Sequence, residues 1–127
     1  MAVVIRAAHY PGRAPIEAYG NGGFRFAGMS HRGSLLCLPS GIYGWEAPSP
    51  DGLDEASLAK VFAEAGEIEI LLVGTGTELR PLSVALRDRC RAVKIVAEPM
   101  ATGAAVRTFN VLLAEARAVA AALIAVA

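Results

Sequence analysis

The apolar run Ile68–Val73 restricts the fold of this chain, because so many β-branched and leucine residues in succession are typical of a strand buried on both faces of a sheet. It leads directly into the small-residue loop Gly74–Thr77. Before it, Asp54 is expected to cap a helix that Gly66 ends, and after it Leu82–Arg91 is predicted to be a second helix. A strand with a helix on either side indicates an α/β core with a parallel sheet.

The C-terminal part is predicted to form one more strand and one long helix. Val93–Val96 is the strand, and Thr102 is expected to cap a helix that runs from about Gly103 to about Val126. Apolar residues there recur at helical spacing, and the other side is mostly alanine. We therefore expect burial on more than one side, within the fold or at an interface with a partner or another copy of the chain. The most apolar tract, Ala118–Ala127, has ten residues, whereas a membrane span needs about 18, so no membrane span is expected.

Residues 14–45 have the pattern of an antiparallel meander. Short alternating or apolar segments are separated by tight turns such as Gly20–Gly23 and Gly28–Gly33. These strands are expected either to extend the main sheet or to form a small sheet beside it. Trp45 is expected to plug the end of a sheet, with anchoring of a partner as the alternative. No linker or internal repeat is visible, so residues 1–127 are predicted to form a single domain.

Charge and motif content disfavour several classes of protein. Twelve Lys and Arg balance twelve Asp and Glu, which disfavours nucleic-acid binding because that depends on neutralising phosphates. No HxxxH, CxxC or HExxH spacing is present, so we expect no metal, no cofactor and no catalytic constellation. Met1–Ala8 lacks the apolar core of a secretory signal, and a cytoplasmic protein is therefore expected.

The two cysteines, Cys37 and Cys90, are too few for a disulfide framework. We expect two free thiols in a reducing compartment. Four cationic residues near Cys90 in the sequence could lower its pKa, which leaves a redox or nucleophilic role as the alternative. No histidine lies near it in the sequence to support that role.

Two loops form the candidate ligand site. Gly74–Thr77 lies at the carboxyl end of the buried strand, where open α/β sheets bind ligands and where backbone N–H groups can hold an anion. A tight structural turn is the alternative, since the complete dinucleotide fingerprint and the Gly-Lys-Ser/Thr ending of a P-loop are both missing. Pro99–Gly103 follows the next strand, and the two loops would share one sheet edge if these strands are neighbours. The candidate ligand-binding residues are Gly74, Thr75, Gly76, Thr77, Met100, Thr102, Arg107 and Asn110.

Four polar residues interrupt the apolar C-terminal helix: Arg107, Asn110, Glu115 and Arg117. Because polar groups on a buried helix need partners, we expect hydrogen bonds to loop backbone, and a recognition surface is the alternative. Glu98 and Arg107 are expected to form a salt bridge rather than an acid–base pair.

Three stretches of the sequence carry a family resemblance: IEAYGNGGFRFAGMSHRGSLLCLPSGIYGW, ILLVGTGTE and EPMATGAAVRTFNVLLAEARAVAAALI. Together they resemble domain-of-unknown-function family 498, whose members include a mitochondrial assembly factor (factor 3) of NADH:ubiquinone oxidoreductase, complex I. The resemblance extends from about Ile16 to Ile124. Phe109 stands where many relatives carry Tyr, so any chemistry that needs this hydroxyl is not expected here.

The resemblance implies a three-layer α/β fold, with a central mixed sheet that we expect to be mostly parallel and a small extra β layer. It also implies a non-enzymatic protein-binding domain that assists assembly of respiratory complex I or another membrane complex, with subunits of such a complex as partners. A small-ligand or anion-binding domain, built on the Gly74–Thr77 and Pro99–Gly103 loops, is the alternative.

Overall fold

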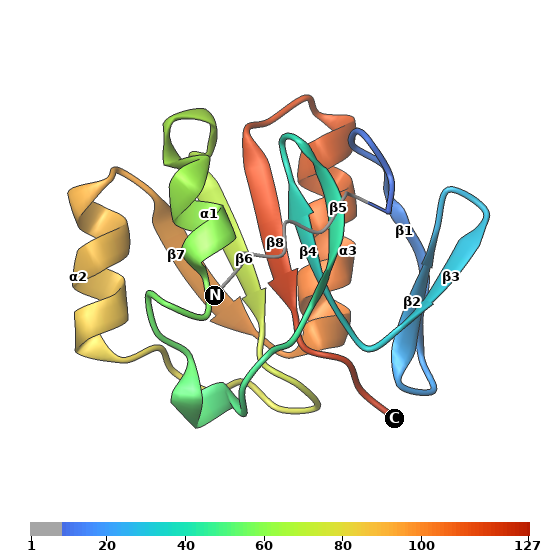
Figure 1. Cartoon of the computed structure of the whole chain (residues 1–127), viewed down its shortest axis with the longest axis horizontal. Helices are drawn as coiled ribbons and strands as arrows, with labels where there is room; N and C mark the ends of the chain where they lie inside the picture. The colour runs from blue at the N-terminus through green and yellow to red at the C-terminus, as the bar shows by residue number, and fades with distance from the viewer. Residues whose placement is uncertain (1–8) are drawn as a thin grey trace, which may run out of the picture.

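The computed structural model describes residues 9–127, in which eight strands and three α-helices form two sheets with helices packed against the larger one (Figure 1). Met1–Ala8, where we expect no targeting signal, lies outside the described residues. The elements in chain order are β1 (Ile16–Gly20), β2 (Gly23–Phe26), β3 (Met29–Arg32), β4 (Ser34–Leu38), β5 (Gly41–Trp45), α1 (Ala59–Ala63), β6 (Ile70–Gly74), α2 (Val84–Ala92), β7 (Val96–Met100), α3 (Thr102–Ala114) and β8 (Val119–Leu123).

The larger sheet has the strand order β5-β4-β8-β6-β7. β6 is parallel to both β7 and β8, whereas β4 is antiparallel to both β5 and β8. The expectation of a mostly parallel sheet is therefore wrong, and the sheet is mixed. The reason lies in the meander of residues 14–45, which divides between the two sheets: β1, β2 and β3 pair with one another, and the β4–β5 hairpin extends the main sheet.

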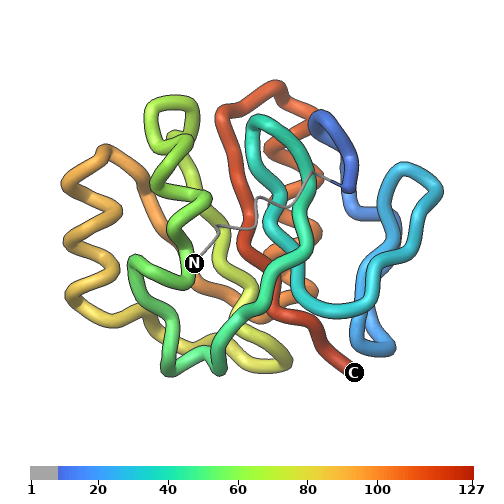
Figure 2. Tube along the Cα trace, viewed as in Figure 1, coloured from blue at the N-terminus to red at the C-terminus, as the bar shows by residue number. Residues whose placement is uncertain are grey.

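The predicted helix from Gly103 to Val126 is wrong in its second half. The helix α3 ends at Ala114, and Val119–Leu123 forms β8, which lies in the middle of the main sheet between β4 and β6 (Figure 2). All five residues of β8 are buried, and three of them are alanines. A run of residues this apolar is equally typical of a strand covered on both faces and of a buried helix. Its periodicity therefore does not distinguish a strand from a helix.

The chain leaves α3 through a Schellman motif that contains no glycine. Ala116 has a φ of +57°, the backbone N–H of Ala116 donates to the carbonyl of Leu113, and the N–H of Arg117 donates to the carbonyl of Leu112. This pair of bonds satisfies carbonyls at the end of the helix and reverses the chain toward β8. Alanine occupies the left-handed position that glycine usually takes, which is why the sequence does not signal the end of the helix.

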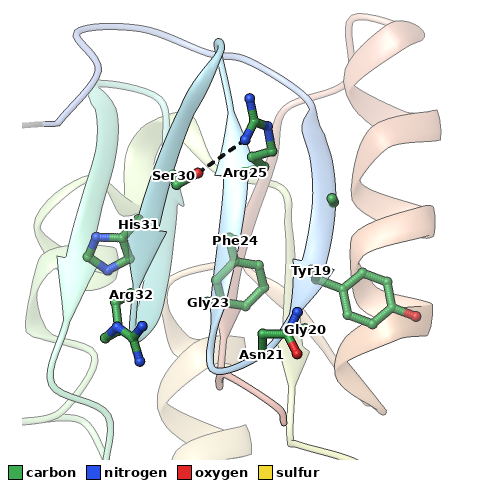
Figure 3. A pocket seen from close by; sticks show the side chains of 10 residues that line it. Tyr19, Gly20, Asn21, Gly23, Phe24, Arg25, Ser30, His31 and Arg32 are labelled. Atoms are coloured by element: carbon green, nitrogen blue, oxygen red, sulfur yellow. Dashed lines mark hydrogen bonds between the residues drawn. The ribbon is translucent and has the colours of Figure 1, made fainter.

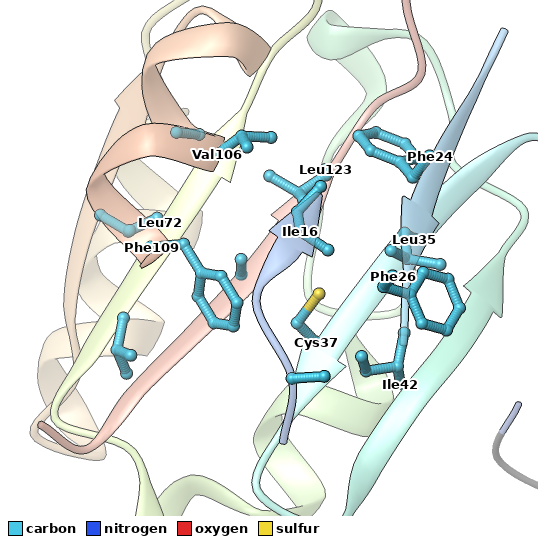
Figure 4. Packing of buried hydrophobic residues seen from close by; sticks show 14 residues of the cluster. Ile16, Phe24, Phe26, Leu35, Cys37, Ile42, Leu72, Val106, Phe109 and Leu123 are labelled. Atoms are coloured by element: carbon cyan, nitrogen blue, oxygen red, sulfur yellow. The ribbon is translucent and has the colours of Figure 1, made fainter. Parts of the chain in front are cut away.

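The faces of the main sheet are covered differently. On one face, α1 and α2 bury a cluster that includes Leu71, Leu86 and Cys90. On the other face, α3 and the small sheet together bury a second cluster, in which Phe109 of α3 and Phe26 of β2 take part (Figure 4). The outer layers are thus helical on one side and mixed on the other, so the three-layer expectation holds in part.

Several predicted boundaries shift in the structure. Asp54 does not cap α1, which begins at Ala59; instead its Oδ1 accepts a hydrogen bond from the N–H of Ser57 in the preceding turn. The strand predicted at Val93–Val96 is β7, which starts at Val96 and includes Pro99. Proline is tolerated there because β7 is an edge strand.

Trp45 lies at the end of β5 and is half-buried against the cluster beneath α1 and α2. Its Nε1 donates a hydrogen bond of 2.8 Å to the carbonyl of Ser57. The indole thus ties the β4–β5 hairpin to the turn before α1, as expected of a residue that plugs the end of a sheet. Among the described residues, no helix is long and apolar enough to cross a membrane.

Candidate functional site

The two candidate loops lie side by side at one edge of the main sheet. β6 and β7 are parallel neighbours, with Gly74 in register with Met100. The loops that follow these strands therefore leave the sheet at the same edge. The sequence predicts this arrangement if the two strands are neighbours. The N–H of Thr75 donates to the carbonyl of Met100 at 2.9 Å, which joins the loops directly.

Thr75 is buried, with 2% of its surface exposed, and its hydroxyl organises the loop after β6. Oγ1 donates to the carbonyl of Glu78 at 2.7 Å and lies 3.2 Å from the carbonyl of Met100. The same oxygen accepts a hydrogen bond from the N–H of Arg80 at 3.0 Å. The hydroxyl of Thr75 thus bonds within its own turn, whereas its N–H bonds to the neighbouring loop.

Thr102 holds three chain segments together at the start of α3. Its side chain is fully buried; Oγ1 donates to the carbonyl of Ile124 at 2.7 Å and accepts the N–H of Gly76 at 3.0 Å. Its own N–H donates to the carbonyl of Gly76. The expected N-cap role is wrong, because Ala101 is the N-cap and Thr102 is the first helical residue. Its hydroxyl bonds across the fold rather than to the helix.

Gly74 is favoured by this arrangement. A Cβ at this position would lie 3.0 Å from both Cα and Oγ1 of Thr102 and 3.1 Å from a methyl group of Leu123. These distances are tighter than most Cβ contacts, so any other residue would require Thr102 or Leu123 to shift by a few tenths of an ångström. Gly76 adopts a φ of +105°, which also favours glycine.

The side chains of the other candidate residues do not converge on a shared site. Thr77 is exposed, and Met100 packs against the edge of the α3-side cluster. Asn110 bonds the backbone of Ile16 twice, with Oδ1 accepting its N–H and Nδ2 donating to its carbonyl, each at 2.8 Å. Arg107 is exposed on α3. Among the described residues no ion pair joins it to Glu98, so the expected salt bridge is wrong.

A groove that the sequence analysis did not find lies between α3 and β7. It has a volume of about 540 Å³. Because α3 packs over β6 and β8, the side chains of β7 on that face remain uncovered. Apolar side chains and charged groups line it together; they are Ile70, Leu72, Val96, Met100 and Leu112, with Thr108, Glu69, Lys94, Glu98 and Arg117. Val96 is an exposed valine at the start of the edge strand β7. It is the one residue in the sequence that could have indicated this groove.

A second hollow, of about 420 Å³, lies on the small sheet near its glycine-rich turn (Figure 3). It is flanked by Arg25, whose guanidinium lies 3.4 Å from Oγ of Ser30, and by Arg32. His31 is half-buried there, and its Nε2 lies 3.1 Å from the carbonyl of Ser34. The described residues that line this hollow include no carboxylate, so it holds no acid–base pair.

Neither cysteine has the environment of a reactive thiol. Both are buried, with 2% of Cys37 and 1% of Cys90 exposed. Burial raises the pKa of the Cys37 thiol, and burial also raises that of Cys90, against the smaller opposite effect of the Arg89 charge. The suggestion that cationic neighbours lower the pKa of Cys90 is therefore wrong. Desolvation outweighs the charges, because the thiol points into the core.

The described part of the chain contains no group of three or more His, Cys, Asp or Glu placed to hold a metal ion. Together, the structure defines a small α/β domain with a mixed sheet, internally bonded loops and an open groove. Residues 16–124 match a family model described as "Protein of unknown function (DUF498/DUF598)", and the chain belongs to this family. The family resemblance seen in the sequence is confirmed.

Three proteins illustrate what the chain is similar to. A crystal structure described as that of an outer membrane protein from Bartonella henselae superimposes with a TM-score of 0.89 at 59% identity and covers 94% of this chain and 100% of that one. An uncharacterized protein of Rhodobacter capsulatus is 40% identical over 94% of this chain and 90% of its own length. NADH dehydrogenase (ubiquinone) 1 alpha subcomplex assembly factor 3 of Mus musculus is 31% identical over 92% of this chain and 63% of its own length. The chain therefore spans less than two thirds of that mouse protein.

Proposed function

We propose that this chain is a non-enzymatic protein-binding domain that assists assembly of respiratory complex I or another membrane complex. The similarity to the mouse assembly factor over 92% of the chain supports this role. The partners would be subunits of such a complex. The chain would bind them non-covalently through its surface and would not catalyse a reaction on them.

The observation that carries this proposal is the groove between α3 and β7. Half-exposed apolar side chains (Ile70, Met100 and Leu112) line it together with exposed acidic and basic side chains. Protein interfaces combine apolar and charged groups in this way, since apolar contacts supply the hydrophobic gain and charged groups supply specificity. Grooves beside a helix commonly receive an amphipathic segment of a partner.

The small-ligand alternative is less favoured by the geometry. An anion at the Gly74–Thr77 loop would need free N–H groups, but the N–H of Gly76 is already donated to Thr102 and that of Thr75 to Met100. The nearby carboxylate of Glu78, which lies 3.7 Å from a guanidinium nitrogen of Arg80, would also oppose an anion. Releasing these bonds would leave buried polar groups without partners.

Affinity purification of the tagged chain from its native cells, followed by mass spectrometry, tests the proposal. We expect subunits of a respiratory or other membrane complex to be recovered. The variant Val96→Asp, at a groove position where 57% of the side-chain surface is exposed, should reduce that recovery by about tenfold or more. Val84→Asp on α2, where 74% is exposed, is the matched control and should leave recovery unchanged.

Two outcomes would contradict the proposal. One is that no such subunits accompany the wild-type chain. The other is that Val96→Asp and Val84→Asp recover them equally well, because the groove would then not be the binding surface. Both variants change exposed side chains, so circular dichroism should show that each is folded.

A further inference from the structure

The outer face of α3 carries a stripe of residues at helical spacing, three of which are exposed and one half-buried. We call Ala104, Arg107 and Val111 of α3, together with the C-cap residue Glu115, the α3 stripe. Val111 is apolar, yet 57% of it is exposed. Arg107 and Glu115 are exposed, and neither side chain forms a hydrogen bond or an ion pair with another described residue. These are two of the polar residues for which the sequence left a recognition surface as the alternative.

The order of charges along the stripe is self-complementary. Arg107 lies four residues before Val111 and Glu115 four residues after it, which places the Cα of each about 6 Å from that of Val111 along the helix axis. If a second identical helix lies antiparallel across the first, with a two-fold axis at Val111, each arginine meets the glutamate of the other helix. The two valines then meet at the centre.

We propose that a second copy of this chain docks on the α3 stripe and forms a two-fold dimer through antiparallel α3 helices. Two-fold interfaces use the same surface on both subunits, and they therefore require a patch that complements itself. The α3 stripe meets this requirement in both charge and apolar content. Ala104, and Ala114 beside the stripe, are small and exposed or half-exposed, so the two helices can approach closely.

The apolar area available to the dimer extends beyond the stripe. Thr108 and Leu112 lie on the side of α3 that borders the groove over β7, and both are half-buried. A second α3 lying across the first would cover part of Leu112 as well as Val111. The formal net charge of the chain is zero, so two copies do not repel each other over long distances.

Charge favours a second copy over other occupants. An acidic segment or an anionic lipid surface would pair with Arg107 but would leave Glu115 facing negative charge, and a basic segment would do the reverse. A copy of the same helix satisfies both charges at once. This inference goes beyond the proposed function and does not depend on it, because the purified chain alone is sufficient to test it.

Sedimentation equilibrium of the purified full chain, at concentrations up to about 1 mM, is the test. We expect a reversible dimer with twice the 13.2 kDa mass of the monomer. Arg107→Glu or Glu115→Arg alone should raise the dissociation constant about tenfold, because each creates two repulsive pairs in the dimer. The double variant Arg107→Glu with Glu115→Arg should restore dimerisation, since the pairs form again with their signs exchanged.

Arg87→Glu is the matched control, because it makes the same charge change at an exposed position on α2 and should leave the dissociation constant unchanged. A wild-type chain that remains monomeric throughout this range overturns the proposal. So does a double variant that dimerises no better than the single ones. If Arg107→Glu abolishes recovery of complex subunits while the wild-type chain is monomeric, the stripe binds a different protein, and the second-copy proposal is wrong.

Discussion

The hydroxyl of Thr102 donates a 2.7 Å hydrogen bond to the carbonyl of Ile124, although the two residues are 22 positions apart. The same oxygen accepts the N–H of Gly76. One buried side chain therefore connects the loop after β6, the start of α3 and the segment after β8. These three segments meet at the candidate loop site, where the hydroxyl of Thr102 occupies the amide of Gly76.

Replacing Thr102 with valine should destabilise the fold by about 1–3 kcal/mol, because it removes the hydroxyl that pairs with the half-buried carbonyl of Ile124 and the half-buried N–H of Gly76. Urea denaturation followed by circular dichroism measures this loss. Thr77→Val makes the same chemical change at an exposed position of the neighbouring loop and should alter the unfolding free energy by less than about 0.5 kcal/mol. Equal effects of the two substitutions would contradict the role given to Thr102.

Replacing Ala116 with glycine should stabilise the chain by about 0.5–1 kcal/mol, since Ala116 adopts a φ of +57° that glycine reaches without strain. The comparison is Ala114→Gly, in the last turn of α3, which should destabilise by a similar amount because glycine is a poor helix former. Thermal or urea unfolding of both variants measures whether each substitution raises or lowers the unfolding free energy. A destabilised Ala116→Gly variant would argue against the Schellman motif.

Both thiols should resist modification in the native state. Because burial of Cys37 and Cys90 raises the pKa of each thiol and blocks access, a disulfide reagent at pH 8 should react slowly with the folded chain and rapidly in denaturant. Absorbance of the released thiolate follows both reactions. Fast labelling of Cys90 in the folded chain would instead support the redox role that its charged neighbours suggested.

His31 should make the fold less stable at mildly acidic pH. Burial, opposed by the hydrogen bond to the Ser34 carbonyl, lowers the pKa of His31 below its ordinary 6.5, and the nearby His9 adds to this decrease. The unfolded chain then binds the proton more tightly, so stability decreases as the pH falls through 6.5 and levels off below the folded-state pKa. Urea midpoints measured from pH 8 to pH 5 should show this loss.

His31→Gln is the control for that pH dependence, because glutamine can still donate to the Ser34 carbonyl but does not titrate. It should reduce the loss of stability between pH 7 and pH 5 relative to the wild type. An unchanged profile would show that other groups, such as the carboxylates, account for the acid sensitivity.

Local patterns in the sequence predicted β6 and the two loops, and also that the loops would lie side by side if their strands pair. An apolar run that is flanked by glycines and helices has few interpretations other than a buried strand. The division of Gly103–Val126 into α3 and β8 was not predicted. Its only local signal is Ala116, and alanine normally continues a helix. The inward direction of Cys90 was also missed, since neighbouring charges along the sequence do not show which way a side chain points.

The groove could not be predicted for a different reason. It exists because β7 is an edge strand that α3 does not cover, and strand order is a property of the whole chain rather than of any segment. The loop residues were located correctly at the sheet edge, but the hydrogen bonds that occupy them come from segments as distant as Ile124. Whether these loops bind a ligand stays a prediction.

The place of β8 in the sheet has a consequence for biosynthesis. β4 and β6 are joined only through β8, which is the last of the described strands to leave the ribosome. Until Val119–Leu123 has emerged, the hairpin β4–β5 and the β6–β7 pair have no shared partner, and the apolar edges of both stay open. The nascent chain can therefore complete this sheet only after Val119–Leu123 has been made, and until then its open strand edges are sites for pairing with other chains.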